Sequence, residues 1–445
     1  MITRRNREAL VAVVLGVAAL VAGIQLINIA KGEIANPGNE SIIQPAGTIR
    51  TSAVDVSIGW NQTWGGNNSD YGTGIWSDGS SVYSSGFTYS AGAGAADVLL
   101  VKWDAAGHQL WNRTWGYATG DVCNSIWGSG TAIYTCGETF VVSKWEMLLV
   151  KWDTDGNQLW NRTFGGSSMS SGKSVWIDGS AVYTCGEVYN GSNGNDLLLV
   201  KWDSDGNKLW NRTWGGAGTE QGTSVRGSGS VIYTCGYTDS FGAGGYDMLL
   251  VKWDDSGSAA WNRTWGFDGG DVAFDLWTDG TAIYTCGRTY ATYGYLYGNY
   301  DDIALLKYRS NGTLEMNKTW GSNATEQGKA IAVTSSAIYV LGNTNAAGND
   351  DFLLVQWDLA GNPLGNITWG GNDTEYGNAL WSDGTSIYAC GDTYSFGAGD
   401  VDNAIIKWIL PSAVLGIDLV PYIALVAVSA IAFLAIKLKR VRGVA

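Results

Sequence analysis

Apolar positions in the middle of the chain fall into short segments separated by clusters of Gly, Asp, Asn and Ser. Residues 174–183 (SVWIDGSAVY) and 196–203 (DLLLVKWD) show the pattern, because both are rich in β-branched and aromatic residues and end at turn-forming residues. Such segments are typical of β-strands. The pairs Asp178-Gly179 and Asp205-Gly206 are signals of tight hairpin turns. The pattern predicts many short strands joined by hairpins.

These segments belong to an internal repeat. A segment of the type Trp-Asn-Arg-Thr-Trp recurs, and its asparagine returns at intervals of 49 to 55 residues. Three further strand-like segments recur in step with it, so each period holds four predicted strands. One four-stranded antiparallel unit per period of about 50 residues is typical of a propeller blade. The sequence therefore predicts an all-β fold, a seven-bladed β-propeller of four-stranded antiparallel blades.

The phase of the repeat predicts how the ring closes. The first unit begins with a lone outer strand at 55–64, and the last unit ends with a third strand at 402–409. Pairing these two segments completes the seventh blade and removes an exposed sheet edge. We therefore expect the propeller to cover residues 55–409 and to be closed by its N-terminal outer strand.

The repeat also resembles a known family. Residues 201–216 (KWDSDGNKLWNRTWGG) and 231–238 (VIYTCGYT) are similar to the repeats of the seven-bladed β-propeller repeat family, which occurs in archaeal and bacterial cell-surface proteins. The resemblance covers about residues 55–409 and returns in every period. It implies the fold, and it implies no single activity, because the family is defined by its architecture.

Two long apolar runs flank the repeat, at 9–30 and at 419–438, and each is long enough to cross a bilayer as a helix. Basic residues precede the first run and follow the second, and an excess of Lys and Arg stays in the cytoplasm. We therefore predict two transmembrane helices, the first a signal anchor, and a propeller held at the extracellular side of the cell membrane. The remaining segments are then a cytoplasmic basic tip (1–8), linkers (31–54 and 410–418) and a cytoplasmic basic tail (439–445). A cleaved signal peptide is the alternative for the first run, and a processed surface-protein tail is the alternative for the second.

Composition narrows the function. The chain of 445 residues has a formal net charge of −14, and such a surface repels phosphate backbones, so we expect no nucleic-acid partner. It holds one histidine, His108, in a predicted turn, which disfavours a Ser-His-Asp triad or a histidine metal site. Five of the six cysteines occupy one slot of the second strand, too far apart from blade to blade for disulfides. We expect them to be small buried residues.

Glycosylation sequons occupy the outer strands. Their Asn and Thr lie on one face of an extended strand, opposite the two aromatic residues of the segment. We predict N-glycosylation at the outer-strand asparagines Asn61, Asn112, Asn161, Asn211, Asn262, Asn317 and Asn366. The alternative is that Asn and Thr are simply the favoured residues of this strand.

Carboxylates recur at two places that a propeller brings to one face. The first set begins the inner strands: Asp70, Asp121, Glu220, Asp271, Glu326 and Glu375, with Ser170 in the remaining blade. The second set begins the third strands: Asp97, Glu146, Asp196, Asp247, Asp302, Asp351 and Asp402. One interpretation is a cation-binding mouth, with Ca²⁺ as the metal because it takes oxygen ligands. The alternative is that each acid accepts hydrogen bonds from amides of nearby turns. We otherwise expect no cofactor.

Loop length indicates the same face. The connections between second and third strands vary, and the longest, 288–302, is rich in tyrosine. Variable tyrosine-rich loops on a rigid scaffold are typical of recognition surfaces. The predicted partner-binding residues are Tyr290, Tyr293, Tyr295, Tyr297 and Tyr300.

These observations favour a binding role over catalysis. The leading hypothesis is a recognition or adhesion module for extracellular protein or glycan, acting through the acidic face with the long loops. The alternative is a structural, glycosylated component of the cell envelope. A propeller enzyme, quinoprotein-like or acting on glycans through a pair of carboxylates, is less favoured, and we expect that the chain is not an enzyme.

Overall fold

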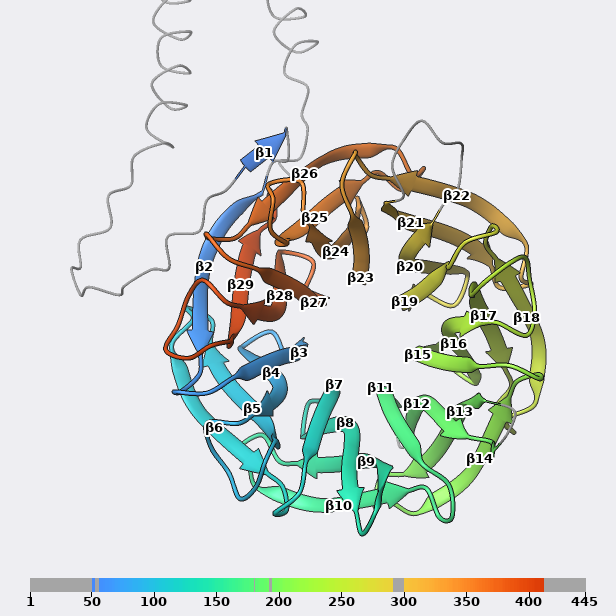
Figure 1. Ribbon diagram of the computed structural model, residues 1–445, viewed down its shortest axis with the longest axis horizontal. Helices are drawn as coiled ribbons and strands as arrows, with labels where there is room; N and C mark the ends of the chain where they lie inside the picture. Colours follow the sequence, from blue (N-terminus) through green and yellow to red (C-terminus); the bar gives the residue numbers. More distant parts are fainter. Residues whose placement is uncertain (1–49, 53–55, 180, 192–193, 291–299, 412–445) are drawn as a thin grey trace, which may run out of the picture. The chain divides into compact units, whose positions relative to one another are not determined.

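The computed structural model describes residues 50–52, 56–179, 181–191, 194–290 and 300–411. Within these ranges the chain forms seven antiparallel sheets arranged around a central axis (Figure 1). In five of them the strands follow one another in sequence from the axis outward, and β1 and β2 are the exceptions in the other two. The protein is therefore a seven-bladed β-propeller. The fold and the blade number predicted from the repeat are confirmed.

Each blade contributes one strand to each of four layers. The inner strands are β3 (Asp70–Ser77), β7 (Asp121–Ser129), β11 (Ser170–Asp178), β15 (Glu220–Ser228), β19 (Val272–Thr278), β23 (Glu326–Val333) and β27 (Glu375–Ser382). The second strands are β4 (Ser81–Thr88), β8 (Ala132–Val141), β12 (Ala181–Tyr189), β16 (Val231–Thr238), β20 (Ala282–Tyr290), β24 (Ile338–Thr344) and β28 (Ser386–Thr393). The third strands are β5 (Asp97–Asp104), β9 (Lys144–Trp152), β13 (Asn195–Asp203), β17 (Asp247–Trp253), β21 (Asp301–Arg309), β25 (Asp351–Trp357) and β29 (Asp402–Ile409).

The outer strands complete the blades. They are β6 (Gln109–Trp115), β10 (Gln158–Phe164), β14 (Lys208–Trp214), β18 (Ala259–Trp265), β22 (Leu314–Trp320), β26 (Pro363–Trp369) and β2 (Ser57–Trp64). Blades are numbered here by their inner strands, so that blade 1 begins at β3 and blade 7 at β27.

The ring closes as the phase of the repeat predicts. β2 pairs antiparallel with β29, with Asn61 opposite Ile406 and Trp64 opposite Asn403, so the seventh blade joins the two ends of the repeat. A further strand was not foreseen: β1 (Arg50–Ser52) pairs with β26 and makes blade 6 five-stranded. Residues 50–52 therefore lie in a sheet rather than in the predicted linker, because the outer edge of β26 offers unpaired backbone groups to any nearby segment.

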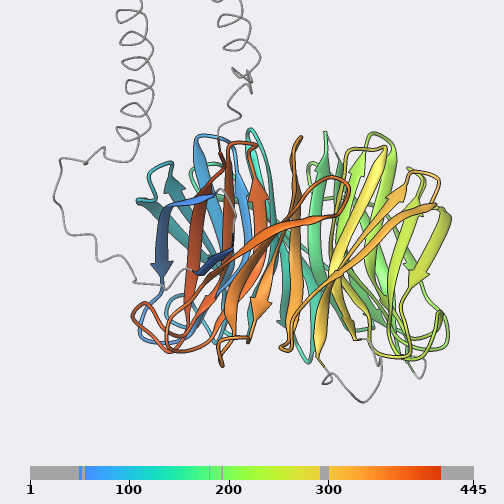
Figure 2. The same cartoon turned by 90° about the horizontal axis from the view of Figure 1, so that it is seen from above.

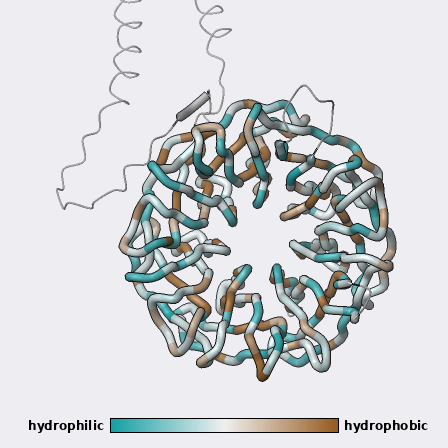
Figure 3. The backbone as a smooth tube through the Cα atoms, in the orientation of Figure 1, coloured by the Kyte–Doolittle hydropathy of each residue, from teal (hydrophilic) through white to brown (hydrophobic). Residues whose placement is uncertain are grey.

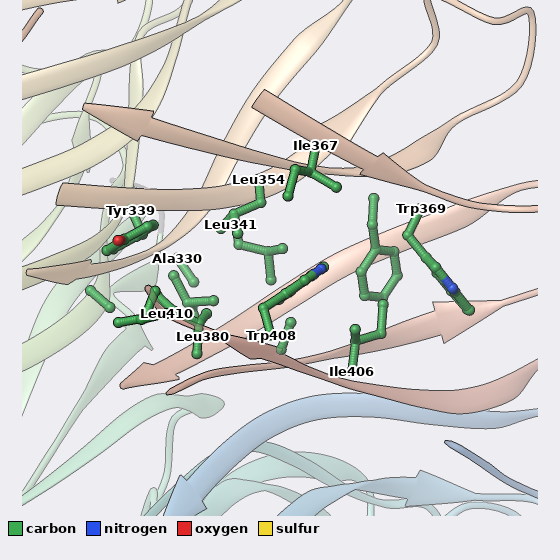
Figure 4. Close-up of a cluster of buried hydrophobic side chains, with 14 of the residues drawn as sticks. Ala330, Tyr339, Leu341, Leu354, Ile367, Trp369, Leu380, Ile406, Trp408 and Leu410 are labelled. Atoms are coloured by element: carbon green, nitrogen blue, oxygen red, sulfur yellow. The ribbon is translucent and has the colours of Figure 1, made fainter. Parts of the chain in front are cut away.

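The hydrophobic core lies between the blades. Between blades 6 and 7, side chains such as Leu354 of β25 and Trp408 of β29 are at most 1% exposed and pack face to face (Figure 4). Similar clusters fill the other blade junctions. Along the chain trace, hydrophobic positions concentrate inside the blades and hydrophilic positions at the loops (Figure 3). Burial between blades is the main stabilising term, at roughly 25 cal/mol per Å² of apolar surface.

The repeated residues hold each blade to the next. In blade 2, Arg162 of the outer strand donates from Nε to the carbonyl oxygen of Gly206 at 3.0 Å, in the hairpin turn of blade 3. The turn itself is stabilised by Asp203, whose carboxylate accepts from the amides of Asp205 and Asn207 at 2.9 and 2.8 Å. Gly206 has a φ of +81°, and a Cβ there would meet the Arg162 side chain at 3.0 Å. The Asp-Gly-Asn segments are thus turns that receive a neighbouring blade.

The cysteines are small buried residues, as predicted: all six are buried and free of disulfides. The predicted membrane segments 9–30 and 419–438, with the basic tip and tail, lie outside the described residues. Among the residues that the structure does describe, no helix is long and apolar enough to span a membrane.

Candidate functional site

The strands run between two faces of the propeller (Figure 2). The face that carries the connections between second and third strands, and those from one blade to the next, is called the loop face here. The opposite face carries the tight hairpins and is called the turn face. The predicted carboxylate rings belong to the loop face, as do Tyr290 and Tyr300 at the two ends of the described part of the tyrosine-rich segment. The inner strands surround a central channel.

The inner carboxylates are buried, and each accepts a hydrogen bond from a nearby turn, although Oδ1 of Asp121 and of Asp271 has no partner among the described residues. Asp70 is 0% exposed, and its Oδ2 accepts from the Gly66 amide at 2.7 Å and from the Ser90 hydroxyl at 2.7 Å. Glu220, also 0% exposed, accepts from the Gly216 amide at 2.8 Å. In four other blades the backbone amide four positions before the carboxylate donates the same hydrogen bond. The acceptors are Asp121, Asp271, Glu326 and Glu375.

The outer carboxylates meet the inner ones across the blade junctions. A Cβ on Gly65 would lie 1.6 Å from Oδ1 of Asp402 and 2.9 Å from Oδ2 of Asp70, so both carboxylates face the backbone of this glycine. Burial, followed by the charge of Asp271, raises the pKa of Asp247 to about 6. Burial and the neighbouring acid likewise raise the pKa of Asp196 and Asp302. Each pair of carboxylates therefore lies at the contact between two neighbouring blades.

The inner carboxylates accept hydrogen bonds from turn amides, as the alternative interpretation expects. In the outer set Asp196, Asp302 and Asp351 are only half-buried, and a cation-binding mouth stays a prediction. Glu146 of blade 2 and Ser170 of blade 3 occupy equivalent positions at the next junction. Glu146 forms an ion pair with Lys144 at 3.0 Å, and the Ser170 hydroxyl accepts from the Met147 amide at 3.0 Å. Asp97 accepts from the Gly94 amide at 3.1 Å. Among the described residues no three His, Cys, Asp or Glu side chains are grouped so that they could hold a metal ion. Asp351 begins β25 in the same slot.

The sequons differ in their accessibility. Asn112, Asn262 and Asn317 are exposed on the outer strands, whereas Asn161, Asn211 and Asn366 are half-buried. Asn61 is only 5% exposed, and Asn366 lies opposite Ser52 of the added strand β1. Glycosylation stays a prediction, and the folded chain offers the first three asparagines most readily.

The loop face carries exposed aromatic side chains. Tyr290 is half-buried and Tyr300 is 42% exposed, while Tyr293, Tyr295 and Tyr297 lie outside the described residues. Other loops add aromatic residues that sequence analysis did not single out. Exposed by 38 to 53%, they are Tyr89, Tyr117, Tyr189, Phe241, Tyr246 and Tyr394.

Three hollows lie among these loops. One of about 490 Å³ is lined by Tyr71, Tyr89 and Asp400, and one of about 360 Å³ by Arg288, Tyr290 and Asp301. A third, of about 160 Å³, includes Trp145 and Tyr189. The loop face is therefore an uneven surface with aromatic and charged walls, drawn from several blades.

The narrowest part of the central channel, called the neck here, is a cavity of about 100 Å³. Every inner strand has a β-bulge at the same place, and a bulge redirects the side chain that it carries. Residues at the seven bulges all line the neck: Thr73, Asn124, Lys173, Thr223, Phe274, Lys329 and Asn378.

Four of the seven bulge residues link neighbouring blades. Thr73 Oγ1 donates to the carbonyl oxygen of Cys123 in the next blade at 2.7 Å, and Asn124 Nδ2 donates to that of Gly172 at 2.8 Å. Thr223 and Asn378 make the equivalent bonds. Lys173, Phe274 and Lys329 depart from this pattern, and two of the three place amines in the neck.

On the turn-face side of the neck lies a wider cavity of about 270 Å³, called the vestibule here. It is walled by Trp127, Trp176, Trp277 and Trp381, with Arg226 standing in the slot that holds tryptophan in five blades. In blade 6 that slot holds Ala332, which leaves space between the walls. Trp127 and Trp381 meet edge to face with ring centroids 5.1 Å apart. Trp127, Arg226 and Trp381 line both cavities, so the vestibule and the neck meet there.

Sequence analysis missed the channel residues. The signal that would have found them is a comparison of the seven copies position by position, since the neck and the vestibule hold the departures from the repeat. His108, by contrast, lies in an exposed turn and pairs with Asp104 at 2.9 Å, far from any channel position.

Solved structures similar to this chain are propeller domains. The WD40 β-propeller domain of Doa1 matches with a TM-score of 0.53 and 10% sequence identity, covering 81% of this chain and 98% of that chain. The β-propeller domain of the Trilobed protease from Pyrococcus furiosus matches with a TM-score of 0.43 and 10% identity, covering 73% and 91%. The Pyrococcus horikoshii acylaminoacyl peptidase matches with a TM-score of 0.43 and 11% identity, covering 72% and 49%.

No family model matches the chain, and no curated protein matches its sequence. The similarity to the Doa1 domain agrees with the seven sheets in showing a β-propeller. At such low identity it shows the fold alone.

Proposed function

We propose that this chain is a membrane-anchored recognition module that presents its propeller outside the cell and binds a protein or a glycan through the loop face. The anchoring rests on the apolar runs at 9–30 and 419–438. The binding role rests on one observation, the exposed aromatic side chains that several blades contribute to this face. Tyrosine supplies a large contact area at a low cost in conformational entropy, which is why it is frequent in recognition surfaces.

The loop face suits recognition by its chemistry as well as by its shape. Arg288 pairs with Asp301 at 2.7 Å beside Tyr290, so charged hydrogen-bonding groups lie next to an aromatic ring in one hollow. Tyr71 and Phe87 stack with ring centroids 4.6 Å apart, and Phe87 meets Tyr89 edge to face at 6.1 Å. A ligand on this face would meet a rigid aromatic cluster backed by polar groups, which is the usual make-up of a binding hot spot.

A structural role in the cell envelope is the second candidate function, and exposed leucines on the outer strands support it. The outer strands expose a leucine in the same slot of four blades, at 45 to 54%: Leu110, Leu159, Leu209 and Leu364. Repeated apolar residues around the rim would support lateral contacts between copies, as in a glycosylated structural component of the cell envelope.

One pair of variants tests both functions. In the full-length chain, the loop-face variant carries Tyr89→Ser, Tyr189→Ser and Tyr394→Ser, and the rim variant carries Leu110→Ser, Leu209→Ser and Leu364→Ser. The two triplets are matched in exposure, at 40–47% and 45–54%. Binding is measured in nanodiscs against arrays of cell-surface glycans and proteins, and self-association by sedimentation and electron microscopy.

Recognition through the loop face predicts at least a tenfold loss of affinity in the tyrosine variant and none in the leucine variant. The structural role would be supported instead if the native chain bound none of the glycans or proteins tested but formed ordered lattices, and if the leucine variant did not form them. Proteolysis of intact cells checks the topology, since the propeller should be cut from outside.

Catalysis is not part of the proposal. The sequence holds one histidine, and it lies in an exposed turn, while the buried carboxylate pairs are enclosed by turn amides and offer no open pair to a substrate. A chemical step would need groups that reach a ligand, and the loop face offers mainly aromatic and hydrogen-bonding side chains.

A further inference from the structure

The central channel carries cations in positions where the repeat does not require them. Lys173 and Lys329 occupy bulge slots that hold Thr or Asn in four blades, and Arg226 occupies a slot that holds Trp in five. Each lysine forgoes the hydrogen bond to the next blade that Thr or Asn makes there. The repeat fold therefore does not explain these three residues.

The neck is positive in a protein that is acidic as a whole. Three cations, Lys173, Arg226 and Lys329, line it together with one carboxylate, Asp275, whereas the chain has a formal net charge of −14. Asp275 is already engaged: its Oδ1 accepts from the Ser224 hydroxyl at 2.7 Å and its Oδ2 from the Ile331 amide at 3.1 Å. It therefore balances only part of the positive charge.

The two amines differ in their surroundings. Lys173 lies 4.0 Å from Glu187, at the edge of ion-pair distance. Lys329 Nζ lies 3.7 Å from the centre of the Phe274 ring, a cation–π contact. Burial, followed by the charge of Arg288, lowers the pKa of Lys329 to about 8, so an anion beside this amine would relieve an unfavourable charge.

The vestibule adds flat apolar walls to this charge. Its tryptophans present faces and edges at the same end of the channel where Arg226 and Trp381 reach the neck. The two cavities, of about 270 and 100 Å³, are smaller than the roughly 300–1,000 Å³ of sites for drug-sized ligands. The neck, of about 100 Å³, has room for one small anionic group.

We propose that the central channel is a binding site for an acidic monosaccharide, whose anionic group lies between Lys173 and Lys329 in the neck and whose ring lies against the tryptophans of the vestibule. The tryptophans of the vestibule suit the apolar face of a sugar ring, and Arg226, which lines both cavities, can donate to its hydroxyl groups. The vestibule lies on the turn-face side of the channel, away from the exposed aromatic residues of the proposed function, whereas Lys329 also faces Arg288 and Asp301, which line a loop-face hollow.

The test uses the full-length chain and four probes: glucuronate, glucose, inorganic sulfate and benzoate. Glucuronate is expected to bind at least tenfold more tightly than glucose, which lacks the charge, and than sulfate or benzoate, which lack the polyhydroxylated ring. Calorimetry or ligand-observed NMR measures the affinities. Equal affinity for glucose overturns the anion site, and equal affinity for sulfate or benzoate overturns the assignment to a sugar.

Variants then locate the site. Lys329→Gln is expected to lower glucuronate affinity at least tenfold, and Lys329→Arg, which keeps the charge, to restore most of it. Lys208→Gln is the matched control, because Lys208 is an exposed lysine on β14 outside the channel. Equal effects of Lys329→Gln and Lys208→Gln overturn the proposal, and melting temperatures show whether each variant is folded.

The pH profile is an independent readout. Glucuronate affinity is expected to fall as the pH rises through about 8, where Lys329 loses its proton. The groups that face Lys329 are Arg288 and Cys286 of β20, Asp301 of β21, and Asp275 and Phe274 of β19. Asp392, which accepts from Asn378 of the neighbouring strand in blade 7, has its pKa raised by burial to about 7, and Asp392→Asn removes its contribution to the profile. A profile that is flat from pH 7 to 9 overturns the role of Lys329.

Discussion

The guanidinium carbon of Arg226 lies 4.6 Å from the centre of the Trp127 ring, although the two residues belong to inner strands of blades 4 and 2. The same arginine lies 3.7 Å from Asp275 of blade 5, and Trp127 meets Trp381 of blade 7. Trp381, Trp127, Arg226 and Asp275 thus form a chain across the channel. Trp381, Trp127 and Arg226 belong to blades 7, 2 and 4, which are not neighbours, and their inner strands come together only around the channel axis.

Arg226→Met should weaken this chain. It removes the cation–π contact with Trp127 and the pairing with Asp275, at a cost of about 1–3 kcal/mol in the free energy of unfolding. Chemical denaturation measures the change, and tryptophan fluorescence should shift because Trp127 loses a cation from its face. Arg309→Met is the control, since Arg309 is 63% exposed and its surface pair with Glu315 contributes little. Equal losses in both variants would contradict the finding.

Gly65 is required by the two carboxylates that face it at the closing junction. Gly65→Ala should destabilise the propeller by about 1–3 kcal/mol, because its Cβ would lie 1.6 Å from Oδ1 of Asp402. Gly130→Ala, in an exposed turn with open space around it, should change the free energy of unfolding by less than about 0.5 kcal/mol. Thermal unfolding of both variants checks the difference, and a Gly65→Ala protein as stable as the native one would refute the close approach.

An unpaired indole in blade 6 offers a stabilising substitution. In blade 3, Trp202 Nε1 donates to Thr184 Oγ1 at 3.0 Å. In blade 6 the equivalent residue is Val340, and Trp357 Nε1 has no hydrogen-bond partner among the described residues. Val340→Thr should therefore stabilise the protein by about 1 kcal/mol, and Thr184→Val should destabilise it by about 1–3 kcal/mol. Urea unfolding measures both, and effects of the same sign in the two variants would contradict this account.

Buried carboxylates make stability depend on pH. Burial raises the pKa of Asp392 to about 7, and burial together with Asp271 raises that of Asp247 to about 6. A carboxyl whose pKa is higher in the folded state binds its proton more tightly there. Its contribution to stability is therefore full below about pH 4 and is lost as the pH rises to about 7. The free energy of unfolding should fall between pH 5 and 8.

Asp392→Asn is the control for this pH dependence, since it removes the titrating group at nearly unchanged shape. The slope of the free energy of unfolding against pH, from denaturant titrations between pH 5 and 8, should become shallower. Below about pH 4 the opposite effect takes over, because Asp153 and Asp203, whose hydrogen bonds to asparagines in the turns lower their pKa, are then protonated. An unchanged slope in the variant would exclude Asp392 as a source.

Glycosylation should follow exposure. Peptide mapping of the protein from its native membranes should find glycan on Asn112, Asn262 and Asn317, which are exposed, and none on Asn61, which is 5% exposed. Asn262→Gln should lower the intact mass by one glycan, and Asn61→Gln should leave the glycan mass unchanged. Glycan on Asn61 would mean that it is attached before the propeller closes.

Much of the fold could be predicted because the strands and turns of each repeat are marked by residues close together in the sequence. Turn pairs such as Asp178-Gly179 mark the hairpins, and the lone strand before the first full unit predicts the pairing of β2 with β29. β1 could not be predicted, because three residues carry no pattern and their pairing with β26 depends on a free sheet edge. The acidic rings were placed on the correct face, but their burial depends on turn amides that the sequence does not position.

The sequence by itself determined the class of fold, the number of blades and the closure of the ring, since each of these follows from strand periodicity and turn chemistry. Tertiary structure alone decided which residues meet in the channel. The bulges turn Lys173 and Lys329 toward the axis, and the ring brings Arg226 to Trp127 over about 100 residues of chain. Contacts between blades that are not neighbours follow from the geometry of the closed ring, and no local pattern encodes them.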